Sequence, residues 1–95
     1  MITYHFDKGQ MRAIATNEEG KEIGESRIVI QDGVWVADHT FVDPSARGQN
    51  VAYELVKTLM AAVREAGQKV RPTCSYVVKE MDRRPEYADL RYQPD

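Results

Sequence analysis

The chain has 95 residues, a length that allows one compact domain and excludes a multi-domain enzyme. Its 42% hydrophobic and 29% charged residues are typical of a globular protein and exclude a disordered or collagen-like chain. With 13 Lys and Arg against 15 Asp and Glu, the formal net charge of -2 gives no general attraction for a polyanion, so we expect no nucleic acid partner.

The single cysteine, Cys74, excludes an internal disulfide framework and fits a reducing compartment, so we expect a cytoplasmic protein. No apolar run approaches the roughly 20 residues of a membrane span, and residues 1–7 lack the basic and apolar regions of an export signal. We therefore expect no membrane association. The residues after Leu90 are expected to form a short polar tail, and residues 1–95 a single minimal domain.

The first half of the sequence predicts strands separated by turns, over residues 11–16, 21–31 and 34–42. Residues 17–20 read as the loop of a hairpin. Gly24 interrupts the second strand and predicts a bulge or a close backbone approach. Asp32 and Gly33 predict a type I′ turn, because both central residues of that turn need a positive φ.

The third strand, Val34 to Val42, is rich in β-formers, and its two-residue period assigns its side chains to two faces. One face would hold Trp35, Ala37, His39 and Phe41, and the other Val34, Val36, Asp38, Thr40 and Val42. Trp35 and Phe41 are expected in the core.

The second half begins with a loop over residues 43–50 and continues with a helical period in which Val51, Leu55, Leu59, Ala62, Val63 and Ala66 recur. Gly67 supplies the stop of this long helix. A short strand over residues 69–73 would then lie parallel to the third strand through a right-handed crossover. Ser75 is expected to cap a short helix, and residues 85–90 to form a closing turn. The predicted fold class is α/β, with an antiparallel meander of about three strands, one parallel strand, one long helix and short C-terminal helices.

The residues Arg47-Gly48-Gln49-Asn50-Val51-Ala52 stand between a strand and a helix N-terminus, where free backbone N–H groups and the helix dipole favour an anion. Gly48 lets the backbone approach a ligand, and Asn50 tolerates left-handed geometry or caps a helix. These features predict a phosphate or pyrophosphate site. The alternative is a loop that simply caps its helix.

The stretch from Phe41 to Val56 resembles motif A of the GCN5-related N-acetyltransferases (GNAT), whose pattern is Arg/Gln-x-x-Gly-x-Gly/Ala after a strand. Together with Asp38-His39-Thr40, residues 69–76 and residues 85–90, it resembles the small single-domain GNAT-like subfamily. The resemblance implies a splayed sheet that binds acetyl-CoA or coenzyme A, with the pantetheine arm paired to backbone around Phe41 and Val42. The pyrophosphate-binding residues would be Arg47, Gly48, Gln49, Asn50, Val51 and Ala52.

The sequence departs from the family at Asn50, where the pattern has a glycine. Asn adopts left-handed dihedrals more cheaply than other non-Gly residues, but its side chain occupies space where backbone and phosphate should meet. We therefore expect weakened coenzyme A binding.

Three residues are candidates for catalysis. Cys74 is expected where a strand ends and a helix begins, a position that favours a thiolate. The resemblance makes Cys74 a candidate catalytic residue near the acyl thioester. The alternative is that Cys74 is a small buried residue of the core. His39, on the adjacent strand, is the candidate base that would partner Cys74, or else packs between sheet and helix. Tyr76 is implied as the acid that protonates the departing thiolate, the alternative being an aromatic packed at a helix start. Arg83 and Arg84 are either a patch for the adenosine 3′-phosphate or simply solvated.

Two functions follow. The first is an acetyl-CoA-dependent N-acetyltransferase acting on a small-molecule or protein amine, by direct attack or through an acetyl-Cys74 intermediate. The alternative is a non-catalytic coenzyme A or acyl-CoA binding module, which Asn50 and the short chain favour; a plain interaction domain is a third reading. The chain is expected to be a monomer or a homodimer.

Overall fold

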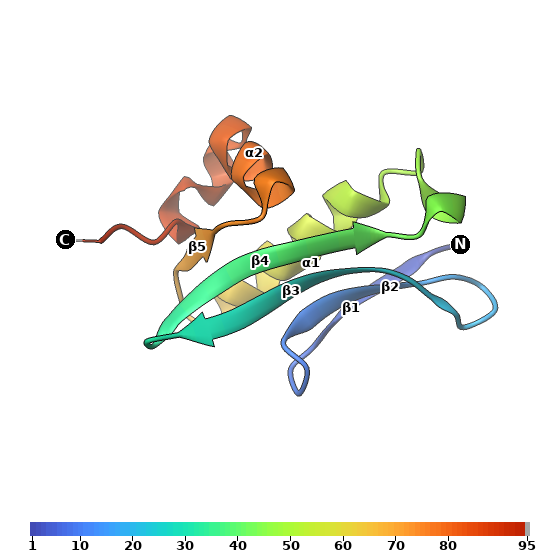
Figure 1. Ribbon diagram of the computed structural model, residues 1–95, viewed down its shortest axis with the longest axis horizontal. Helices are drawn as coiled ribbons and strands as arrows, with labels where there is room; N and C mark the ends of the chain where they lie inside the picture. Colours follow the sequence, from blue (N-terminus) through green and yellow to red (C-terminus); the bar gives the residue numbers. More distant parts are fainter. Residues whose placement is uncertain (95) are drawn as a thin grey trace.

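The computed structural model describes residues 1–94; Asp95, the last residue of the expected domain, lies outside the described residues. Its five-stranded sheet has the order β1-β2-β3-β4-β5, and helix α1 covers one face (Figure 1). The strands are β1 (Thr3–Asp7), β2 (Arg12–Thr16), β3 (Glu22–Gln31), β4 (Val34–Val42) and β5 (Val70–Pro72). The helices are η1 (Pro44–Ala46), α1 (Val51–Glu65), α2 (Ser75–Arg83) and η2 (Pro85–Leu90). Strands β1 to β4 pair antiparallel and β4 pairs parallel with β5, which confirms the predicted mixed α/β sheet.

Strand β1 is the element that the sequence analysis missed, so the antiparallel meander extends beyond the expected three strands. It pairs with β2 from Thr3 opposite Thr16 to Asp7 opposite Arg12. Tyr4 and Phe6 pack against the core, as the alternation of polar and aromatic residues in this stretch would have indicated.

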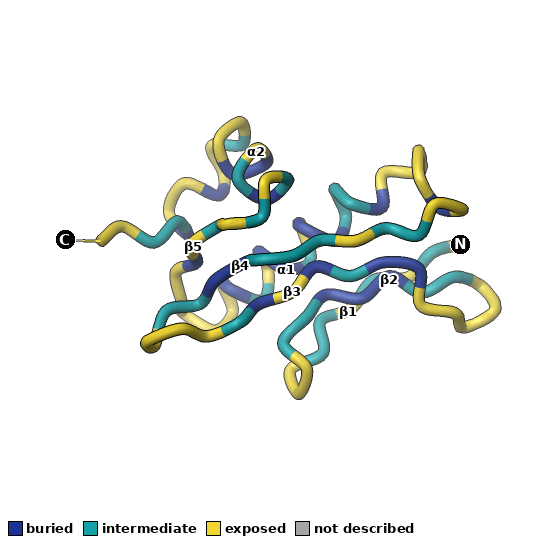
Figure 2. The backbone as a smooth tube through the Cα atoms, in the orientation of Figure 1, coloured by how far each residue is buried: buried dark blue, intermediate teal, exposed yellow. Residues whose placement is uncertain are grey.

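The core lies between the sheet and α1. Helix α1 buries a continuous apolar stripe, made of Val51, Leu55, Val56, Leu59, Met60 and Val63. Figure 2 shows buried segments in α1 and in β2 and β3, the strands on which it packs. The helix ends as predicted, since Gly67 has a φ of 68° and the Gln68 N–H bonds to Val63 O at 3.1 Å. Among residues 1–94, no helix is long and apolar enough to cross a membrane.

The predicted hairpin turns are confirmed. Asp32 and Gly33 have φ values of 52° and 80°, as a type I′ turn requires. In the loop before β3, the Gly20 N–H bonds to Asn17 O at 3.0 Å.

Strand β4 contains a bulge that its sequence pattern does not predict. Arg27 of β3 pairs with His39, whereas the next residue, Ile28, pairs with Ala37. Asp38 is therefore an extra residue in β4, and such a bulge shifts the alternation of side chains beyond it.

Because of the bulge, the four residues predicted for one face of this strand lie on two different sides of the sheet. Ala37 belongs to the core beneath α1, and Trp35 packs against that core. His39 and Phe41 lie on the opposite side of the sheet, where His39 contacts Glu25. The expectation that Phe41 belongs to the core is wrong, because its residue surface is 47% exposed. We call this uncovered side, which carries Arg12, Glu25, Arg27, His39 and Phe41, the open face.

The residues after η2 are not a free polar tail, which corrects the expectation for them. Arg91 forms a parallel bridge with Val70, and the Tyr92 N–H bonds to Val70 O at 2.9 Å. The Arg71 guanidinium lies 5.0 Å from the centroid of the Tyr92 ring. These contacts hold the C-terminal segment along the outer edge of β5.

Gly24 lies at both of the features that the sequence predicts for it, a bulge and a close approach to the backbone. The register with β2 shifts beside it, at Ile23. A Cβ at Gly24 would lie 3.0 Å from Leu55 Cδ1, 3.1 Å from Phe41 O and 3.3 Å from Val51 Cγ1. The absence of a side chain therefore lets the first turn of α1 pack closely on the sheet.

We expect Gly24→Ala to lower the free energy of unfolding by about 1–3 kcal/mol, because the added methyl overpacks a site that includes backbone. Urea unfolding at constant m-value measures this loss. Gly9→Ala is the control, since its Cβ would meet the flexible Asp7 carboxylate at 3.3 Å. Equal stability of the two variants would contradict the close packing at Gly24.

Candidate functional site

The candidate site begins where β4 and β5 part. β5 pairs with β4 over Trp35 to Ala37. Ala37 O then accepts backbone N–H bonds from both Thr73, at 2.9 Å, and Cys74, at 3.0 Å. Beyond this point the chain turns into α2, while β4 continues to Val42 with β3 on one side and, in the described part of the chain, no strand on the other (Figure 1). The sheet thus splays open between β4 and α2.

Backbone groups of β4 are directed into this gap. The Asp43 N–H bonds to Ile23 O at 2.8 Å, so the backbone at Asp43 faces β3. Because the direction alternates along an antiparallel pair, the N–H and C=O of Val42 face the free edge, whereas those of Phe41 face β3. Of the two residues expected to pair with a pantetheine arm, Val42 is the one whose backbone is available.

A left-handed loop leads from β4 to the N-terminus of α1. Gly48 and Asn50 have φ values of 87° and 61°. The first helical hydrogen bond runs from the Glu54 N–H to Asn50 O at 3.0 Å. The N–H groups of residues 51–53 precede this bond, so they have no acceptor within the helix. The Asn50 side chain makes no capping bond, so the interpretation of this loop as a side-chain cap is not supported at Asn50.

A groove with a volume of about 410 Å³ joins the loop, the end of β4 and α2. It is lined by Val42, Ala46, Arg47, Gly48, Asn50, Val51, Ala52, Tyr53 and Tyr76. No heavy atom lies within 4 Å of the place that a Cβ would take at Gly48, so a ligand can approach the backbone there. These features fit a phosphate group. Gln49 lines a different groove, of about 540 Å³, on the side of the N-terminus.

Cys74 lies at the inner end of the splay. It is the N-cap residue of α2, so the expectation that Ser75 caps this helix is wrong; Ser75 is its first helical residue. Cys74 Sγ lies 3.6 Å from Thr40 Oγ1, which in turn lies 3.0 Å from the buried Ser26 Oγ. The thiol therefore contacts a hydroxyl on the α1 side of the sheet.

His39 does not partner Cys74, which corrects the expected pair. Its Nε2 lies 3.3 Å from Glu25 Oε2 on the open face, and its side chain is 44% exposed. Thr40, the neighbour of His39, takes the position facing Cys74. The bulge in β4 is the physical reason, because without it His39 would share the α1 side with Ala37.

Tyr76 projects from the first turn of α2 into the groove. Burial raises the pKa of its phenol, and the Glu80 carboxylate raises it further, while Arg83 and Arg84 act in the opposite direction. The phenol is therefore protonated at neutral pH and can donate a hydrogen bond or a proton.

Glu80 is a site residue that the sequence analysis missed. It is 0% exposed and accepts hydrogen bonds from Arg83 Nη2 and Arg84 Nε, both at 2.6 Å. The Arg84 guanidinium lies 4.3 Å from the centroid of the Tyr53 ring. The two arginines are thus held rather than simply solvated, and the spacing of Glu80 three and four residues before them was the available signal.

Solved structures share this fold. A GCN5-like protein from Staphylococcus aureus, described as a proposed N-acetyltransferase, superposes with a TM-score of 0.71 at 22% identity and covers 100% of this chain and 90% of its own. A proposed acyl-CoA N-acyltransferase from Klebsiella pneumoniae gives a TM-score of 0.60 at 22% identity, over 88% of this chain and 64% of that one. The splayed mixed sheet is therefore the fold that these two structures share with this chain. No curated protein matches the sequence.

The sequence gives separate evidence for the family. The profile of the GCN5-related N-acetyl-transferase family matches residues 12–90, most of the chain. The chain belongs to this family, whose acyltransferases use acyl-CoA.

We expect Asn50→Gly to tighten coenzyme A binding several-fold, because glycine adopts the φ of 61° without strain and frees the space beside the helix N-terminus. Titration calorimetry with coenzyme A measures the change. Asn50→Ala is the matched control, since it removes the amide but keeps a Cβ in the left-handed conformation. Equal or weaker affinity for Asn50→Gly would show that the asparagine does not obstruct the site.

Proposed function

We propose that the protein is an acetyl-CoA-dependent N-acetyltransferase that acts on a primary amine. One observation carries the proposal: the free edge of β4 leads directly into the open N-terminus of α1, along a single groove that reaches Tyr76. Family membership supports the reaction class. We also propose that residues 1–95 form a single minimal N-acetyltransferase domain.

The donor would lie along this groove. The N–H groups of residues 51–53 and the backbone at Gly48 would bind the pyrophosphate, with Arg47 as a nearby cation. The backbone of Val42 would pair with the pantetheine amides in the manner of an added strand. Bound acetyl-CoA supplies the activated acetyl thioester, and its acyl end would lie toward the splay at Ala37.

Tyr76 would serve as the acid for the leaving thiolate. Its raised pKa keeps the phenol protonated well above neutral pH, which is the form that a proton donor needs.

Of the two routes, direct attack by the amine is the one we propose. An acetyl-Cys74 intermediate needs a base that removes the thiol proton, whereas Cys74 Sγ contacts the Thr40 hydroxyl.

A non-catalytic coenzyme A binding module is the second candidate. The separation of His39 from Cys74 favours it, because the expected nucleophile and base are not assembled into one site. Turnover of acetyl-CoA separates the two functions, since the module would bind the donor without consuming it.

The cellular setting is also a proposal. The single Cys74 and the net charge of -2 fit a cytoplasmic monomer or homodimer that takes a small-molecule or protein amine as acceptor and does not bind nucleic acid.

We expect Tyr76→Phe to lower kcat by about 10²-fold with little change in the KM for acetyl-CoA, because the acid acts in the transition state. Ethylamine is a suitable acceptor probe, since it is small enough not to need a shaped pocket, and N-ethylacetamide is measured by mass spectrometry. Tyr53→Phe is the matched control, as it removes a hydroxyl from the same groove while keeping the ring beside Arg84. Equal losses in both variants would contradict the assignment, and no turnover by the parent protein would favour the binding module.

We expect Cys74→Ala to retain most turnover, and the parent protein incubated with acetyl-CoA to show no acetyl adduct on Cys74 by intact mass and peptide mapping. Both results follow from direct transfer. A stoichiometric adduct on Cys74, formed within one turnover and accompanied by loss of activity in Cys74→Ala, would establish the covalent route instead.

A further inference from the structure

An apolar groove lies on the α1 side of the sheet, along the C-terminal half of α1. It has a volume of about 620 Å³ and is lined by Phe6, Lys8, Met11, Trp35, Thr58, Ala61, Ala62, Glu65 and Ala66. Figure 1 shows the C-terminal end of α1 and the tip of the β3–β4 hairpin at the same end of the molecule. The groove that reaches Tyr76 begins at the N-terminus of the same helix, so the two grooves lie at opposite ends of α1.

Small side chains keep the apolar groove open. Its three alanines lie on α1 or directly after it, and a methyl group fills little of the space between this helix and Trp35. The hydroxyl of Thr58, which lies on the same wall, already donates a hydrogen bond to Glu54 O at 2.9 Å. The groove therefore offers its occupant apolar contact.

The opposite wall is held by the sheet and by the turn between β1 and β2. Phe6, Met11 and Trp35 are partly buried and pack against the core. Met11 has a positive φ of 54°, and its carbonyl oxygen accepts a hydrogen bond from the Ile28 N–H at 2.8 Å. This wall is thus pre-formed, and aromatic and methionine side chains are enriched in protein interfaces.

A projecting apolar side chain stands beside the groove. Ile30 of β3 lies opposite Trp35 of β4. Residues that lie directly opposite each other in an antiparallel pair have their side chains on the same side of the sheet. Ile30 is therefore on the α1 side, yet it is 56% exposed. A hollow and a side chain that can fill one lie next to each other, and such a surface is complementary to itself about a two-fold axis.

The charges at the mouth of the groove have the same self-complementary arrangement. Lys8 lies in the β1–β2 turn and Glu65 at the end of α1, so the two walls carry opposite charges. Lys8 Nζ lies 3.7 Å from Glu65 Oε1, and the two side chains are 83% and 76% exposed. An ion pair this exposed contributes little within one chain. A two-fold axis at the groove can place Lys8 of each copy beside Glu65 of the other.

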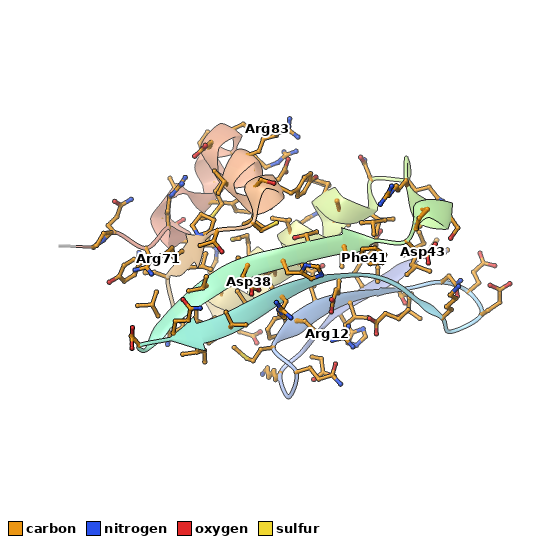
Figure 3. The ribbon with its side chains drawn as sticks, in the orientation of Figure 1. Arg12, Asp38, Phe41, Asp43, Arg71 and Arg83 are labelled. Atoms are coloured by element: carbon orange, nitrogen blue, oxygen red, sulfur yellow. The ribbon has the colours of Figure 1, made fainter. Side chains whose placement is uncertain are left out.

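The open face lacks this arrangement. Figure 3 labels Arg12 and Phe41 on that side of the sheet. Arg12 already bonds to Glu25, and Arg27 to Asp38, so these charges are satisfied within the chain. The apolar groove is therefore the better surface for a second copy.

We propose that the apolar groove is the contact between two copies of this chain, with Ile30 of each copy seated in the groove of the other. Opposite charges at positions 8 and 65 would fix the orientation of the pair. This inference goes beyond the proposed function, because the groove that reaches Tyr76 lies at the other end of α1 and remains open in both copies.

The first test measures the mass of the full chain by sedimentation velocity over a range of concentrations. We expect the mass to rise from 10.8 kDa toward twice that value. Ile30→Ser should raise the dissociation constant of the dimer at least tenfold, because each dimer buries two Ile30 side chains. Phe41→Ser is the matched control, since it removes an exposed apolar side chain from the open face, and it should keep the parent dissociation constant.

The second test exchanges the charges. Lys8→Glu and Glu65→Lys should each weaken self-association several-fold, because each puts like charges at both contacts of the dimer. A mixture of the two variants should recover the parent association, since both contacts then join a carboxylate to an ammonium. An ion pair confined to one chain would not recover, because each variant keeps its like charges within its own chain. Lys79→Glu makes the same charge change on α2 and should associate as the parent does.

Three results would overturn the inference: a monomer at millimolar concentration, equal effects of Ile30→Ser and Phe41→Ser, or a mixture that associates no more than its components. A monomer that binds the apolar dye anilinonaphthalene sulfonate, and loses that binding in Ala61→Arg, would assign the groove to a small apolar ligand instead. None of these measurements uses acetyl-CoA, so their failure leaves the proposed function intact.

Discussion

The carbonyl oxygen of Ala37 is the point on which the candidate site depends. A carbonyl has two lone pairs, and this one accepts from both Thr73 and Cys74. Pairing between β4 and β5 ends there, and the chain after Cys74 is free to begin α2. The free edge of β4, the start of α2 beside it and the groove between them all follow from that one double acceptor.

The bulge at Asp38 comes directly after this point and determines what each side of the opening carries. Arg27 holds Asp38 through two hydrogen bonds, Nε to Oδ1 at 3.0 Å and Nη2 to Oδ2 at 2.8 Å. This contact lowers the pKa of the Asp38 carboxyl below its usual value, so the pair is charged at neutral pH. With Asp38 fixed as the extra residue, Thr40 turns toward Cys74 and His39 toward Glu25. The thiol and the imidazole are thereby assigned to different sides of one strand.

Features that depend on a few adjacent residues could be predicted from the sequence, whereas features that depend on a residue far away along the chain could not. The Asp32-Gly33 turn, the apolar stripe of α1 and the left-handed conformation at Asn50 each follow from a few adjacent residues. The bulge in β4 depends on which residue of β3 lies opposite, and a strict period of two places His39 and Phe41 on the wrong side.

The candidate site divides in the same way. The loop residues around Gly48 and the groove position of Tyr76 could be read from spacing and resemblance. The partners of His39 and Cys74 could not, because Glu25 and Thr40 reach them through strand register. Glu80 also escaped notice, since a charged side chain in a helix is normally solvated and its complete burial depends on tertiary packing.

The burial of Glu80 explains how so small a domain can hold a defined groove. A buried carboxylate that lost its partners would cost about 3–5 kcal/mol, so α2 and its following turn are constrained to keep Arg84 in place. Arg84 lies on the ring of Tyr53, a residue of α1, and Tyr76 stands on the same helix as Glu80. The two tyrosines that line the groove are therefore tied together through one buried charge. The splay at Ala37 opens the sheet, and this charge limits how far α2 can move away from α1.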